Sequence, residues 1–157
     1  MTPQDGLVAV DRDPRTLTRE HFDHVVPATT RWSDNDMYGH LNNAVYYELF
    51  DSVINEWLIT GDVADAIDGP ELGVVAESGC RFFAELAYPG GVDVGVRVER
   101  LGRSSITYAL GLFAADRDEI AALGHWVHVY IDRASRRTVP IPDGVREFLA
   151  AAEAARL

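Results

Sequence analysis

The sequence predicts an α+β domain in which an antiparallel sheet of about five strands wraps around one long central helix and a short helix ends the chain. Three observations support this prediction. Residues 43–58 repeat apolar side chains at helical spacing, residues after about 76 alternate apolar and polar side chains, and one strand-like stretch precedes the helix. Because the helix and the sheet each have one apolar face to bury, they are expected to pack together.

The first element is a strand at about residues 22–31. Pro27 favours an edge position or a bulge for this strand, because proline has no N–H for the hydrogen-bond ladder. Residues 1–20 before it are polar and aperiodic, which predicts a flexible N-terminal arm. Residues 21–157 then form a single domain, since a chain of 157 residues with 47% hydrophobic content suffices for one proper core.

The long helix is expected to run from Asn43 to about Leu58. Its apolar residues mark one broad face for burial: Val45, Tyr46, Leu49, Phe50, Val53, Ile54, Trp57 and Leu58. The opposite side is polar and carries Glu48, Asp51, Ser52, Asn55 and Glu56. Gly61 follows the last periodic residue and indicates the end of the helix.

The strands after the helix are read from alternation. The positions expected to face the core are Ala76, Cys80, Phe82 and Ala84, then Val92, Val94, Val96 and Val98, and then Ile106, Tyr108, Leu110 and Leu112. A last strand is expected at about 119–131. Turn residues between these segments suggest an antiparallel meander. Pro140 and Pro142 precede a helix at about 144–155.

Composition limits the partners and the compartment. A formal net charge of -11 argues against nucleic acid and against an anionic membrane surface. The single Cys80 excludes an internal disulfide, and no secretory signal or run of ~20 apolar residues is found. We therefore expect a cytoplasmic protein.

The segment before the long helix has a layout suited to catalysis. It reads Arg31-Trp32-Ser33-Asp34-Asn35-Asp36-Met37-Tyr38-Gly39-His40-Leu41-Asn42-Asn43. Asn42 is expected to cap the helix, whose N-terminal N–H groups and partial positive charge can stabilise a carbonyl oxygen that becomes negative. Asp36 lies just upstream, within reach of that point.

This order of elements, together with the motif from Asp34 to Asn43, resembles the hot-dog fold acyl-CoA thioesterases of the 4-hydroxybenzoyl-CoA thioesterase family. The resemblance extends from about Phe22 to the end of the chain. Leu41 replaces the more usual valine of the family's motif. Weaker matches are the segments Leu101-Gly102-Arg103-Ser104-Ser105 and Val139-Pro140-Ile141-Pro142, which help by their positions.

The resemblance implies hydrolysis of an acyl-CoA thioester. The second aspartate of the family's motif is catalytic and falls on Asp36, and the backbone N–H that polarises the carbonyl falls on Asn43. Asp36 would act either as a general base on water or as a nucleophile that forms an anhydride. The resemblance also implies a homodimer, often paired into a homotetramer, with active sites between subunits. No cofactor is implied, because coenzyme A is part of the substrate.

Other residues of the motif and of later turns are candidates for substrate contacts. Gly39 permits a left-handed turn and close approach of a substrate, although a plain turn is nearly as good an explanation. His40 either contacts the thioester region or has a structural role, and Tyr46 either lines an acyl pocket or packs in the core. Asn42 belongs to the same group, whereas Asp34 is expected to be structural. Candidates for contacting the anionic end of coenzyme A are Arg103 with Ser104, and Arg133, Arg136 and Arg137.

Three other functions are alternatives to thioester hydrolysis. His125 and His128 would suggest a metal pair on a helix, but in a strand residues three apart point to opposite faces, so no metal site is expected. A hot-dog dehydratase or hydratase would need a histidine paired with an acid around the helix, and no such pair is evident. A non-catalytic acyl-CoA-binding protein remains the third alternative. The acyl group, and whether coenzyme A or acyl carrier protein bears it, are not fixed by the sequence.

Overall fold

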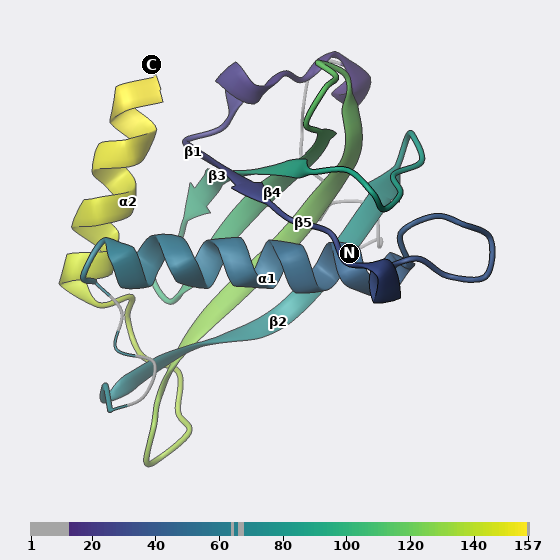
Figure 1. The fold of residues 1–157 in the computed structure, drawn as a ribbon. Helices are drawn as coiled ribbons and strands as arrows, with labels where there is room; N and C mark the ends of the chain where they lie inside the picture. The colour runs from purple at the N-terminus through teal and green to yellow at the C-terminus, as the bar shows by residue number, and fades with distance from the viewer. Residues whose placement is uncertain (1–12, 64, 66–67, 157) are drawn as a thin grey trace.

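In the computed structural model, the long helix α1 (Asn43–Thr60) lies across one face of a five-stranded antiparallel sheet (Figure 1). The structure describes residues 13–63, 65 and 68–156. The other elements are β1 (His24–Ala28), β2 (Glu71–Phe82), β3 (Val92–Leu101), β4 (Ser105–Ala114), β5 (Ile120–Asp132) and α2 (Asp143–Arg156). The predicted α+β architecture of one sheet around one long helix is confirmed.

The strand order in the sheet is β1-β3-β4-β5-β2. Strands β3, β4 and β5 form the predicted meander, but β2 pairs with β5 at the far edge and does not pair with β3. The connection 83–91 can span about 30 Å at ~3.3 Å per residue. It therefore crosses the roughly 14 Å between β2 and β3, three strand spacings of ~4.8 Å, so the glycines and the proline before β3 do not close a hairpin.

β1 is an edge strand, which confirms the position predicted from Pro27. Pro27 lies opposite Asp93 of β3. The strand is shorter than predicted. It ends at Ala28, because the chain then turns into a short 3-10 helix at Trp32–Asp34.

Part of the predicted flexible arm is instead packed on the sheet face opposite α1. Residues 1–12 lie outside the described residues, but Leu17 is only 2% exposed and clusters with Phe22, Phe113 and Leu123. The ring of Phe22 lies against Gly111, where a Cβ atom would come within 2.4 Å of it. The buried Leu17 anchors residues 13–20, so the polarity of this segment was a misleading guide to its flexibility.

The main core lies between α1 and the other face of the sheet. All four predicted valines of β3 and all four predicted residues of β4 are buried, so the alternation in these strands is confirmed. The predicted apolar face of α1 packs against them except at Val45, which is half-buried and outside this core. Phe50 lies over Gly124, where a Cβ atom would be 2.6 Å from its ring. Among the described residues, none of the helices is long and apolar enough to cross a membrane.

The edge strand β2 departs from the predicted burial pattern. A bulge between Val75 and Glu77 shifts its register against β5. Ala76, Phe82 and Ala84 are exposed, although their spacing predicted that they would face the core. β2 is twelve residues long, no other described strand pairs with its outer side, and most of its residues are exposed.

Candidate active site

The motif before α1 folds into a compact loop that returns the chain to the start of the helix. Its ends are joined by a bridge between Asn35 and Leu41, and the N–H of Asp36 donates to the carbonyl of His40 at 2.9 Å. Gly39 has a φ of 81°, which confirms the predicted left-handed turn. The loop therefore holds Asp36 at a fixed place beside the helix terminus.

Asp34 has the structural role that the sequence predicted. Its carboxylate is buried and accepts a 2.7 Å hydrogen bond from the backbone N–H of Arg31 and a 2.8 Å bond from that residue's Nη2. The hydrogen bond from the Arg31 guanidinium is the main cause that lowers the pKa of Asp34. Its carbonyl accepts the N–H of Asn42 at 2.8 Å, so Asp34 ties the loop to the helix cap.

The first turn of α1 leaves the N–H of Asn43 available. Asn42 caps the helix as predicted, since its Oδ1 accepts the N–H of Ala44 at 2.9 Å. The N–H of Val45 donates to the carbonyl of Asn42. Within the part of the chain that the structure describes, the N–H of Asn43 has no acceptor. Asn43 thus offers a donor at the positive end of the helix.

Asp36 and Asn43 line the same surface hollow of about 690 Å³. Its other walls include Tyr38, His40, Tyr46 and the segment 82–85 that follows β2. One carboxylate oxygen of Asp36, Oδ1, accepts the N–H of Tyr38 at 2.8 Å, whereas Oδ2 has no hydrogen bond to any described residue. The hollow therefore combines a carboxylate oxygen free to accept a proton with an unpaired backbone donor.

Tyr46 is both a core residue and a wall of the hollow, so the two alternatives left open by the sequence both apply. It is 3% exposed, and its ring meets that of Phe82 edge to face with centroids 5.0 Å apart. Burial is the main cause that raises the pKa of the Tyr46 hydroxyl. Its hydroxyl is therefore neutral near pH 7.

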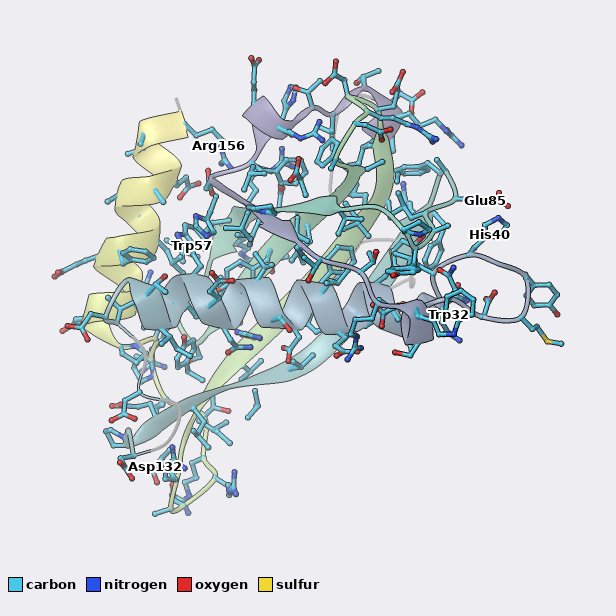
Figure 2. The ribbon with its side chains drawn as sticks, in the orientation of Figure 1. Trp32, His40, Trp57, Glu85, Asp132 and Arg156 are labelled. Carbon is cyan, nitrogen blue, oxygen red and sulfur yellow. The ribbon has the colours of Figure 1, made fainter. Side chains whose placement is uncertain are left out.

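The segment after β2 adds residues that the sequence did not single out. Glu85 Oε2 lies 3.0 Å from His40 Nε2, and Figure 2 shows the two side chains together beside the loop. The carbonyl of Leu86 accepts the N–H of Leu41. These residues come from about 45 positions further along the chain, so no local pattern could place them here.

The structure does not bring Arg103 and Ser104 to the hollow. They form the turn between β3 and β4, where the carbonyl of Ser104 accepts the N–H of Tyr130 and that of Arg103 accepts the N–H of Ile141. The basic residues Arg133, Arg136 and Arg137 lie in the hairpin after β5, next to the first residues of β2. Neither group lines the hollow of its own subunit.

Comparison with known proteins shows the family. A model of the thioesterase-like superfamily matches residues 30–149. The chain belongs to this superfamily. No curated protein sequence matches it significantly.

Among solved structures, the protein PA5185 from Pseudomonas aeruginosa strain PAO1 is 44% identical, with a TM-score of 0.83 over 87% of this chain and 95% of that one. A thioesterase from Thermus thermophilus, solved with coenzyme A and zinc, is 30% identical, with a TM-score of 0.73 over 86% of this chain and 98% of that one. These neighbours confirm the hot-dog fold of this thioesterase-like protein. The narrower assignment to the 4-hydroxybenzoyl-CoA thioesterase family stays a prediction.

Proposed function

We propose that this thioesterase-like protein is a cytoplasmic enzyme that hydrolyses an acyl-CoA thioester to the free acid and coenzyme A. The observation that carries the proposal is the pairing of Asp36 with the unpaired N–H of Asn43 in one hollow. Thioester hydrolysis needs an attacking oxygen and a donor for the charge that arrives on the carbonyl oxygen. The two residues supply these two functions.

In the general-base route, Asp36 takes a proton from a water molecule, whose oxygen attacks the thioester carbon. The carbonyl oxygen gains the negative charge and accepts the N–H of Asn43. The C–S bond then breaks, the thiolate of coenzyme A leaves, and the proton held by Asp36 neutralises it. In the nucleophilic route, Asp36 attacks the carbon directly, the C–S bond breaks, and the thiolate of coenzyme A leaves an anhydride behind. Water then hydrolyses the anhydride to the free acid and the Asp36 carboxylate, and the proton released in this step neutralises the thiolate.

A homodimer, or a pair of homodimers, is the proposed working form, and the outer edge of β2 is its proposed interface. This edge exposes Val74, Val75 and Phe82, which are 36%, 46% and 46% exposed. An unpaired edge with apolar side chains is a template for another strand. If two copies of β2 pair antiparallel about a two-fold axis over their whole length, Glu71 of one subunit lies opposite Phe82 of the partner subunit.

The same pairing supports a role for the basic hairpin in binding coenzyme A. Arg133 donates its N–H to the carbonyl of Pro70, directly before β2, so the hairpin lies at the end of β2 that meets the partner's hollow. In a chain of net charge -11, these three arginines provide a local positive charge for the phosphates of coenzyme A.

A thiol-release assay on a panel of acyl-CoAs, run beside a crotonyl-CoA hydration assay, tests the proposal. Turnover in the first assay alone is the expected result. Hydration without thiol release would assign the chain to the dehydratase or hydratase class. Binding of acyl-CoA with no turnover in either assay would make it a non-catalytic binding protein.

A further inference from the structure

A second cavity, of about 240 Å³, lies at the opposite end of α1 from the hollow that holds Asp36. It is enclosed by the last turns of α1, the start of β2, the end of β5 and the start of α2. Most of its walls are apolar, including Leu58, Leu72 and Val145. The hydrogen-bonding side chains in its wall include Asn55 from α1 and His128 and Tyr130 from β5.

His128 is the unusual member of this wall. Its side chain is 2% exposed, and its Nδ1 atom is buried without a hydrogen-bond partner among the described residues. The imidazole packs against the ring of Tyr108, with centroids 5.5 Å apart. A Cβ atom added to Gly73, which also lines the cavity, would lie 3.4 Å from Nδ1. A buried polar atom without a partner is costly, and a hydrogen-bonding group on a ligand in this cavity would offset that cost.

The imidazole of His128 is uncharged near neutral pH. Burial is the main cause that lowers its pKa to about 4, and the nearby Asp51 carboxylate only partly opposes this effect. A neutral imidazole nitrogen either donates or accepts one hydrogen bond, depending on its tautomer. The carboxylates of Asp51 on α1 and Glu71 on β2 disfavour an anionic ligand beside it. The best-matched group is therefore an uncharged one, such as a hydroxyl, that can serve in either role.

In the proposed β2 dimer, the cavity would lie next to the active site of the partner subunit. Within one subunit, Asn55 lies about 18 Å along α1 from Asn43, at ~1.5 Å per residue. In the proposed dimer, antiparallel pairing of two β2 strands would exchange their ends and bring the cavity beside Glu71 and Gly73 to the hollow beside Phe82 of the partner subunit. Gly73 is exposed in the single chain, which leaves this side of the cavity accessible from the β2 edge.

We propose that this cavity receives the acyl group of the substrate bound at Asp36 of the partner subunit, and that His128 selects acyl groups that carry an uncharged hydrogen-bonding substituent. This inference rests on the proposed thioesterase function and on the β2 dimer. His128 acts as a specificity-determining residue and takes no part in the bond-breaking step.

The test compares matched substrates that differ only in a hydroxyl and a methyl group of similar size. We would measure kcat/KM for ω-hydroxyacyl-CoAs and for the corresponding ω-methyl compounds over a series of chain lengths, and for 4-hydroxybenzoyl-CoA against 4-methylbenzoyl-CoA. The wild type should prefer the hydroxyl compound by about tenfold or more in at least one pair, because a methyl group leaves Nδ1 unpaired. His128→Leu should remove or reverse that preference, and His128→Gln should restore part of it.

His125→Leu is the matched control. His125 is also a buried histidine on β5, but it lies on the sheet face opposite α1 and does not line the cavity. This variant should keep the wild-type preference. Turnover of acyl-CoAs without any preference in the wild type, or a preference that survives in His128→Leu, would overturn the inference. Absence of turnover with every acyl-CoA would instead overturn the proposed function on which it rests.

Discussion

The two ends of α1 present opposite environments. At the N-terminal end, the carboxylate of Asp36 and the N–H of Asn43 face an open hollow in contact with solvent. At the C-terminal end, the neutral imidazole of His128 is buried in a cavity wall that is mostly apolar but also includes Asn55 and Tyr130. Hydrolysis needs water and a charged group, whereas recognition of an acyl group gains from removing water. The difference suggests that one helix serves chemistry at one end and substrate selection at the other, for two different active sites of a dimer.

The largest effect expected at the N-terminal end is that of Asp36→Asn, which removes the proton acceptor or nucleophile. Turnover should fall by about 10² to 10⁴, the range for losing a positioned acid–base group. Thiol release from the best acyl-CoA of the panel provides the measurement. Asp34→Asn is the matched control: it should lower the free energy of unfolding, because it weakens the hydrogen bonds that the buried Asp34 carboxylate accepts from the exposed Arg31, and it should change turnover far less. Near-native turnover by the folded Asp36→Asn variant would contradict the proposed catalytic role of Asp36.

The next prediction distinguishes the contribution of the Asn43 backbone N–H to turnover from that of its side chain. Asn43→Pro deletes the N–H at the first helical position, where proline is tolerated, and Asn42 already has the extended conformation that a following proline requires, with φ of −58° and ψ of 141°. Turnover should fall by about 10² to 10³. Asn43→Ala keeps the N–H and should lose much less. Equal activities of the two variants, both checked by circular dichroism, would show that this N–H does not hold the thioester oxygen.

A charge on the outer edge of β2 should separate Asp36 of one subunit from the proposed acyl cavity of its partner. Val75→Lys places a charge on the proposed interface, so light scattering should show a shift from a dimer or tetramer towards the 17.3 kDa chain. In the same variant, kcat/KM for acyl-CoAs with longer acyl groups should fall by about tenfold or more, because one hydrophobic contact with the acyl group, of ~1–3 kcal/mol, is lost. Pro27→Lys, at the opposite edge of the sheet, is the control and should change neither. A fully active monomer of Val75→Lys would contradict the shared site.

The smallest effect concerns stability at the C-terminal end. Since the pKa of His128 is lowered from 6.5 to about 4, the unfolded chain binds this proton at a higher pH than the folded chain does. The free energy of unfolding should therefore fall as the pH drops from about 6.5 to about 4, by up to roughly 3 kcal/mol at ~1.4 kcal/mol per pKa unit. Urea unfolding at pH 7 and pH 4.5 should show a smaller drop for His128→Leu than for the wild type. Equal drops would mean that His128 is not buried as a neutral group.

The sequence predicted the N-terminal end of α1 far better than the C-terminal end, for a physical reason. The cap at Asn42, the left-handed turn at Gly39 and the position of Asp36 are local features, set by residues within one loop. The cavity at the other end is built from α1, β2, β5 and α2, which meet only after the sheet has formed. Periodicity placed His128 on a strand but could not show which elements would surround it.

The sheet shows the same distinction. Alternation correctly identified the core faces of β3 and β4, because these strands have neighbours on both sides. It was only partly right for β2, where Cys80 packs against the core but Phe82, which has the same spacing, lies at an edge and is 46% exposed. The alternation of apolar residues indicates that a residue is suited to burial but not which surface buries it. Phe82 is expected to be buried in the proposed dimer.

Subunit complementation tests the central claim most directly. Asp36→Asn removes the chemistry, and Gly73→Phe fills the acyl cavity beside His128, so each homodimer should be nearly inactive on the longer acyl-CoAs. When the two variants are unfolded together and refolded as a mixture, a mixed dimer has one site with an intact Asp36 facing an intact cavity. Random mixing should then restore about one quarter of wild-type activity, since half of the dimers are mixed and each has one complete site. No gain over the sum of the separate variants, with mixed dimers shown by mass spectrometry, would place the whole site within one subunit and contradict the account.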